Sequence, residues 1–103
     1  MIKVIDILEV NLEYIICHLY NNDIKKINLK PLIFNHRHLK GIEKLDDSKY
    51  IQLAQIGILG EIFWPETIIN SDGDTWNYDI SPEYIYHCGE DIDIESKEVI
   101  EFK

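Results

Sequence analysis

The sequence is poor in cysteine, proline and glycine, and Ala54 is its only alanine. Its 103 residues include 2 Cys, 3 Pro and 5 Gly, a composition typical of one folded domain. The two thiols, Cys17 and Cys88, could form one disulfide, but their spacing matches no metal-binding or redox motif. Two isolated thiols fit a reducing compartment such as the cytoplasm.

Long apolar runs are also missing. No run approaches the ~18 residues that a membrane-spanning helix needs, and the first residues lead directly into alternating sequence rather than into the apolar segment of a signal peptide. We therefore expect a cytoplasmic protein that does not associate with membranes.

Basic side chains are scarce, with 10 Lys and Arg against 19 Asp and Glu and a formal net charge of −9. Residues 61–103 hold 2 basic and 12 acidic side chains, a net charge of −10, whereas residues 1–60 are close to neutral. Phosphate backbones are bound through Lys and Arg, so this balance argues against direct nucleic-acid binding. The acidic half instead suits a basic protein partner, although acidic surfaces also serve solubility alone.

Isoleucine is abundant, at 20 of 103 positions, and this favours β-strands. Alternating residues over 2–10, 14–20 and 24–29 predict a three-stranded antiparallel meander across residues 2–29, with a tight turn at 21–23. On the first strand, the alternation places four side chains on one face: Ile2, Val4, Leu8 and Val10.

The middle of the chain is less regular. Residues 32–39 show no clear period and fit either a short helical turn or a loop, with Lys30-Pro31 closing the third strand. Residues 42–45 suggest a brief strand, and Asp46-Asp47-Ser48 offers N-cap residues for a short helix to about Leu53. Two hairpins are expected beyond it, one across Leu59-Gly60 and one across residues 70–74.

Ser81-Pro82-Glu83 is the clearest helix signal, because a hydroxyl N-cap precedes a proline at the first helical position. The helix should direct Tyr84, Ile85 and Cys88 inward and end at Gly89.

After this helix, residues 90–95 alternate between carboxylates and isoleucines, with Ile92 and Ile94 on one face. We expect an edge strand or a tail there, and pairing through that edge with a partner or a second copy, most simply as a homodimer.

Two motifs and the opening meander resemble a family of small bacterial proteins catalogued as domain of unknown function DUF2442. The motifs are Leu59-Gly60-Glu61-Ile62-Phe63-Trp64-Pro65 and Tyr78-Asp79-Ile80-Ser81-Pro82-Glu83-Tyr84-Ile85-Tyr86, and the resemblance covers about residues 2–87. It assigns structural roles to six motif residues: Trp64, Pro65, Asp79, Ser81, Pro82 and Tyr86. It implies a compact α+β domain with no established enzymatic activity, no cofactor, and a second small protein as in toxin–antitoxin pairs.

The sequence departs from that family by an insertion at about residues 66–77, which we interpret as an extended hairpin that leaves the core alone. The expected organisation is a DUF2442-like domain over residues 1–89 and an acidic C-terminal strand or tail over residues 90–103.

His36 and His38 are the most suggestive pair for chemistry, because imidazoles at i and i+2 share a strand face and could bind zinc. Neither has further ligands at zinc spacing, so a polar loop rich in histidine is the other interpretation. We expect both Cys17 and Cys88 in the core, away from catalysis.

Two features could bind a protein partner. Trp76 lies in the inserted hairpin, where it could anchor an interface or fold back over the sheet. Asp91, Asp93 and Glu95 form the acidic face of the C-terminal segment.

The sequence thus predicts a single α+β domain, built mainly of antiparallel β-sheet with one or two short helices, without cofactor or bound metal. The expected function is a non-enzymatic interaction or regulatory protein, the acidic antitoxin-like member of a bacterial two-protein pair. The alternative is a small metal-dependent or hydrolytic enzyme that uses His36 and His38.

Overall fold

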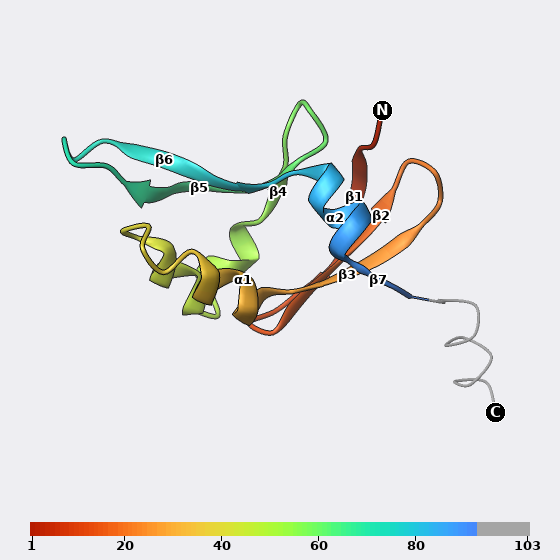
Figure 1. The fold of residues 1–103 in the computed structure, drawn as a ribbon, viewed down its shortest axis with the longest axis horizontal. Helices are drawn as coiled ribbons and strands as arrows, with labels where there is room; N and C mark the ends of the chain where they lie inside the picture. The colour runs from red at the N-terminus through yellow and green to blue at the C-terminus, as the bar shows by residue number, and fades with distance from the viewer. Residues whose placement is uncertain (93–103) are drawn as a thin grey trace.

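The computed structural model describes residues 1–92, which form two antiparallel sheets and four short helical segments (Figure 1). Its elements in chain order are β1 (Val4–Val10), β2 (Tyr14–Leu19), β3 (Ile24–Asn28), α1 (Leu29–Asn35), η1 (Ile42–Asp46), η2 (Tyr50–Leu53), β4 (Gln55–Ile56), β5 (Ile62–Ile69), β6 (Thr75–Ile80), α2 (Pro82–Cys88) and β7 (Glu90–Asp91). The α+β class is confirmed. No helix within residues 1–92 is long and apolar enough to cross a membrane.

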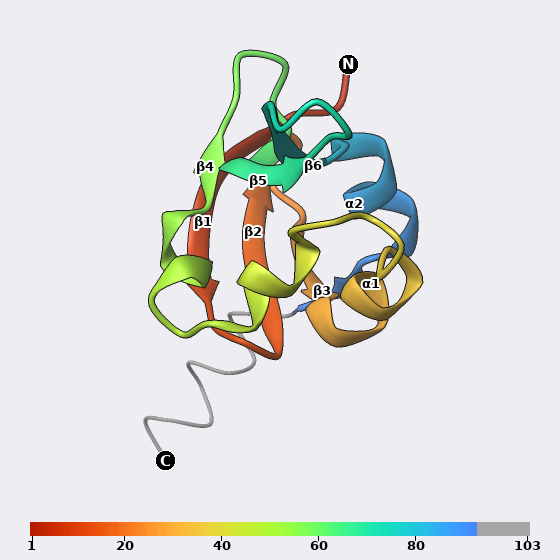
Figure 2. The ribbon, with the colours of Figure 1, turned by 90° about the vertical axis from the view of Figure 1, so that its left-hand side faces the viewer.

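One sheet has the strand order β1-β2-β3-β7 and the other has the order β4-β5-β6. The core contains side chains from both sheets and from all four helical segments, including Ile15 of β2, Trp64 of β5 and Ile85 of α2, each 0% exposed. Viewed along the long axis, β1, β2 and β3 lie side by side, with the helical segments around them (Figure 2). Because each sheet is apolar on its inward face, these elements must pack together to remove that surface from water.

The meander of β1, β2 and β3 is confirmed. Of the four side chains expected on one face of its first strand, Ile2, Val4 and Val10 pack on the core, but Leu8 does not. Its pairing with β2 shifts register twice, between Val4 and Asp6 and again between Ile7 and Glu9. A bulge adds a residue to one strand and so changes which side chains face inward. Val4, Ile7 and Val10 therefore pack on the core, while Leu8 is 43% exposed.

The third strand ends earlier than expected, at Asn28, and α1 begins at Leu29. Pro31 therefore lies in the first turn of a helix, where its missing N–H would have had no intrahelical acceptor. Leu29 and Leu32 are the buried residues of this helix. The segment without a clear period, residues 32–39, is therefore the end of a short helix followed by turns.

The brief strand expected at residues 42–45 is wrong, because η1 is a 3₁₀ helix. Residues three apart lie on one side of such a helix, so both Ile42 and Leu45 reach the core. The N-cap position of η2 is Lys49, which makes no side-chain cap hydrogen bond, so the expected cap at residues 46–48 is one or more residues early. Asp47 still holds the start of η2, since its Oδ1 accepts the N–H groups of Lys49 and Tyr50 at 2.7 and 3.1 Å. These two hydrogen bonds lower the pKa of the Asp47 carboxyl group.

Both later hairpins form, β4 with β5 and β5 with β6. The expectation that residues 66–77 leave the core alone is wrong. Thr67 is completely buried, its hydroxyl donates to the Trp64 carbonyl at 3.0 Å, and the Tyr50 hydroxyl donates to the Pro65 carbonyl at 2.7 Å. The inserted segment therefore starts within the core, and only its turn end lies beyond it.

Helix α2 begins at Pro82 and stops before Gly89, as predicted. Of the three side chains expected inward, only Ile85 is buried; Tyr84 is 39% exposed and Cys88 is also exposed. A helix of 7 residues with one apolar contact face directs a single line of side chains at the core, which explains the difference.

Ser81→Ala tests the N-cap of this helix. The Ser81 Oγ accepts the Tyr84 N–H at 3.1 Å, so alanine leaves that donor without its partner. We expect the free energy of unfolding to fall by about 1 kcal/mol in urea denaturation. Ser71→Ala, at an exposed turn serine, is the control; an equal loss in both variants would contradict the cap.

The segment after α2 forms an edge strand. β7 pairs with β3, and the Ile92 N–H donates to the Ile24 carbonyl at 3.0 Å. Ile92 is half-buried. Asp93, Ile94 and Glu95, which are predicted to continue this segment, lie outside the described residues.

Candidate functional site

The turn end of the β5–β6 hairpin carries the exposed Trp76. Side chains alternate along a strand, so Trp76 lies on the same side of β6 as the buried Tyr78 and Ile80. It is nevertheless 62% exposed, and the interpretation in which it folds back over the sheet is wrong. The hairpin extends past the core at this point, with its turn at the left end of the molecule in Figure 1.

The turn beside Trp76 is well ordered by its own hydrogen bonds. Asn70 Oδ1 accepts the N–H groups of Asp72 and Asp74, each at 2.9 Å, and the Asn70 N–H donates to the Asp74 carbonyl at 2.9 Å. The two aspartates are exposed. The turn that carries these two carboxylates leads directly into the start of β6, where Trp76 lies.

The other tryptophan, Trp64, is part of the core. It is 0% exposed, and its indole Nε1 donates to the Ile51 carbonyl at 3.0 Å. Its ring centre lies 6.1 Å from that of Tyr78. Trp64 therefore positions η2 against the sheet and has no access to a partner.

The other residues of the two DUF2442-like motifs differ in how exposed they are. Pro82 is buried at the start of α2, and Tyr86 is half-buried against the core, whereas Asp79 and Ser81 are exposed. Pro65 is half-buried and offers its carbonyl to Tyr50.

His36 and His38 do not share a strand face; they lie at and just after the C-terminus of α1, with ring centres 6.2 Å apart. His36 Nδ1 is hydrogen-bonded to the Tyr78 hydroxyl at 2.7 Å. Burial raises the pKa of Tyr78, so the phenol stays protonated at neutral pH. Within residues 1–92, no three His, Cys, Asp or Glu side chains lie close enough together to hold a metal ion.

The two cysteines differ in environment. Cys17 is buried in β2, where desolvation raises the pKa of its thiol to about 11 and keeps it neutral at pH 7. Cys88 is exposed, so the expectation of a core position is wrong for it. Both are free thiols.

Asp91 is exposed, but its carboxylate is not free. Its Oδ1 forms an ion pair with Lys25 Nζ at 2.7 Å, and the Lys25 side chain is only 9% exposed. This hydrogen bond raises the pKa of Lys25. No motif in the sequence points to Lys25. The one signal is its spacing from the buried Ile27, which places Lys25 on the inward side of β3.

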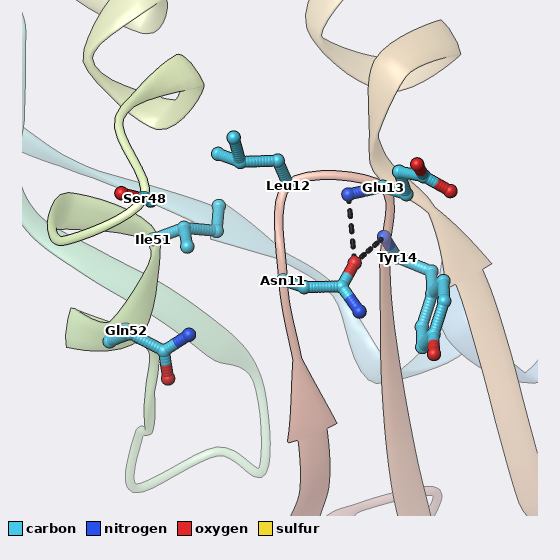
Figure 3. A pocket seen from close by; sticks show the side chains of 7 residues that line it. All are labelled: Asn11, Leu12, Glu13, Tyr14, Ser48, Ile51 and Gln52. Atoms are coloured by element: carbon cyan, nitrogen blue, oxygen red, sulfur yellow. Dashed lines mark hydrogen bonds between the residues drawn. The ribbon is translucent and has the colours of Figure 1, made fainter.

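A shallow pocket of about 480 Å³ lies where the β1–β2 turn meets η2 (Figure 3). Leu12 and Ile51 face each other across it, while Glu13 and Tyr14 point away. Two of its polar side chains are already paired: Asn11 Oδ1 accepts the N–H groups of Glu13 and Tyr14, and Gln52 donates to the Val10 carbonyl.

This chain matches no protein-family model, no curated protein and no solved structure in the comparisons with known proteins. The resemblance to DUF2442 therefore stays a prediction, and function must be argued from the residues themselves.

Proposed function

We propose that this chain is a non-enzymatic interaction or regulatory protein that binds a basic partner protein through the turn end of the β5–β6 hairpin. The observation that carries the proposal is the exposure of Trp76, 62%, on a strand face that is otherwise buried. Exposed tryptophans bury a large area when a partner covers them and often dominate the binding energy.

Charge selects the kind of partner. Asp72 and Asp74 lie in the turn just before Trp76, and the whole chain has a formal net charge of −9. Complementary fields speed the encounter with a basic surface and disfavour acidic ones. The same balance argues against nucleic acid as the partner.

The resemblance to DUF2442 suggests which protein the partner would be. The partner would be the second protein of a bacterial two-protein pair, with this chain as the acidic antitoxin-like member in the cytoplasm. An enzyme built on His36 is less well supported, because its Nδ1 is already bonded to a buried tyrosine.

The test begins with a pull-down from the native host, using the whole chain as bait, followed by binding kinetics with the protein that co-purifies. Trp76→Ala should raise Kd about 30-fold, mainly through a faster off-rate, because it removes the anchor. Tyr20→Ala, at another exposed aromatic residue, should leave Kd unchanged. Equal effects of the two variants would contradict the proposal.

Charge variants then separate the two acidic regions. Asp72→Asn with Asp74→Asn should lower the on-rate, and added salt should shrink that difference. Asp93→Lys with Glu95→Lys tests the C-terminal segment; Asp91 is left intact because it pairs with Lys25. If light scattering of the chain alone shows a dimer and no host protein is captured, a second copy replaces the basic partner.

A further inference from the structure

A second apolar surface lies at the other end of the β5–β6 hairpin, where the loop between β4 and β5 projects from the molecule (Figure 1). The loop carries Ile58, which is 93% exposed, and Leu59, which is 65% exposed. These are large apolar side chains in water, and exposed apolar patches with polar rims mark binding surfaces.

The backbone of this loop is fixed by hydrogen bonds, so the exposure of Ile58 and Leu59 is a property of an ordered structure. The Gly57 N–H donates to the Glu61 carbonyl at 2.8 Å, and the Gly60 N–H donates to the Gly57 carbonyl at 3.0 Å. Glu61 Oε1 accepts the Leu59 N–H at 3.0 Å. A surface that is already ordered loses little conformational entropy when it binds.

The loop is also attached to β1. The Val4 N–H donates to the Gly60 carbonyl at 3.0 Å, and Gly60, with a φ of 80°, packs directly against Lys3. The chain at Gly60 therefore cannot move to cover Ile58 without breaking its hydrogen bond to Val4 of β1.

Beside the loop is a pocket of about 340 Å³, between the N-terminal residues and the start of α2. Both ribbon views place these segments next to each other (Figures 1 and 2). Its apolar lining includes Ile2, Leu59 and Pro82. The lining also includes Ser81 and three carboxylates, those of Glu61, Asp79 and Glu83, against one cation, the α-amino group of Met1. One oxygen of Glu61 already accepts the Leu59 N–H.

We propose that this pocket and the exposed Ile58 form a docking groove for a basic segment of a partner protein, with an arginine or lysine side chain in the pocket. The aliphatic stem of such a side chain packs on apolar residues while its cationic end meets carboxylates. An apolar neighbour in the same segment would cover Ile58. An acidic or second-copy occupant is disfavoured, because it would bring further negative charge to three carboxylates.

The groove is independent of the Trp76 surface. Register places Ile62 opposite Ile80 at this end of the hairpin and Ile69 opposite Thr75 at the other. A partner can therefore use either end, and variants at one end leave the other intact.

The probe is a blocked pentapeptide of alternating leucine and arginine, titrated into the whole isotopically labelled chain and followed by NMR. We expect saturable binding, with the largest shifts at Leu59 and Glu83. The matched peptide with citrulline in place of arginine has the same shape without the charge, and it should bind about tenfold more weakly.

Leu59→Ser and Glu83→Gln should each weaken binding of the arginine peptide about threefold or more, whereas Leu53→Ser and Glu13→Gln, at exposed residues outside the pocket, should not. No saturable binding up to about 1 mM, or equal binding of the citrulline peptide, would overturn the groove. Shifts confined to Asp72, Asp74 and Trp76 would also overturn it, while supporting the hairpin surface of the proposed function.

Discussion

Gly41→Ala should lower the free energy of unfolding by about 3 kcal/mol or more. Gly41 has a φ of 102°, a conformation that side chains with a Cβ rarely adopt. A Cβ added there would lie 2.1 Å from the Thr67 carbonyl oxygen and 3.4 Å from the Ile68 Cα. Both neighbours are backbone atoms, so no flexible side chain can move aside, and the contact between η1 and β5 would have to open.

Gly73→Ala is the matched control for this change. Gly73 also has a positive φ, 88°, but nothing lies within 4 Å of an added Cβ in the β5–β6 turn. Gly73→Ala should lower the free energy of unfolding by only about 1 kcal/mol, from backbone strain alone. Urea denaturation of both variants measures the difference, and equal losses would mean that the close approach of Gly41 to Thr67 is wrong.

Trp64→Ala should lower the free energy of unfolding by about 3–5 kcal/mol, because it leaves a cavity in a fully buried site and removes the hydrogen bond to the Ile51 carbonyl. Trp64→Phe separates the two effects: it keeps most of the apolar volume but leaves that carbonyl without its donor, at about 1–3 kcal/mol. Circular dichroism during urea denaturation follows both variants without depending on indole fluorescence.

The control is the other tryptophan. Trp76→Ala should change stability by less than about 0.5 kcal/mol, because Trp76 is mostly exposed. A loss comparable to that of Trp64→Ala would show that Trp76 packs in the core, and it would remove the basis of the proposed interaction surface as well. The stable Trp76→Ala variant is therefore also the reagent that the binding experiment needs.

The elements predicted correctly are those whose signals are local. The meander follows from period-two alternation between turn residues, and α2 follows from the serine cap and proline at its start. The β5–β6 turn follows from Asn70 and Gly73, which supply a side-chain acceptor and a positive φ.

The candidate surfaces were only partly predictable. The sequence singled out Trp76 and left its exposure open, since either tryptophan could have belonged to the core. The apolar loop at Ile58 and Leu59 was interpreted only as part of a hairpin. Its signal was present, because two large apolar residues stand between Gly57 and Gly60, where a turn would expose them.

By itself, the sequence determined the α+β class, the strand order of the meander and the start of α2, because alternation, caps and turn residues act over a few neighbouring positions. Only the tertiary structure decided the 3₁₀ helix at Ile42–Asp46, the inward face of β1, and the burial of Trp64 against the exposure of Trp76. Each of these depends on contacts between distant segments, such as Gly41 against Thr67 or the Trp64 indole on Ile51. At these positions, the burial of a side chain depends on which distant segment packs over it, and no pattern among neighbouring residues predicts that contact.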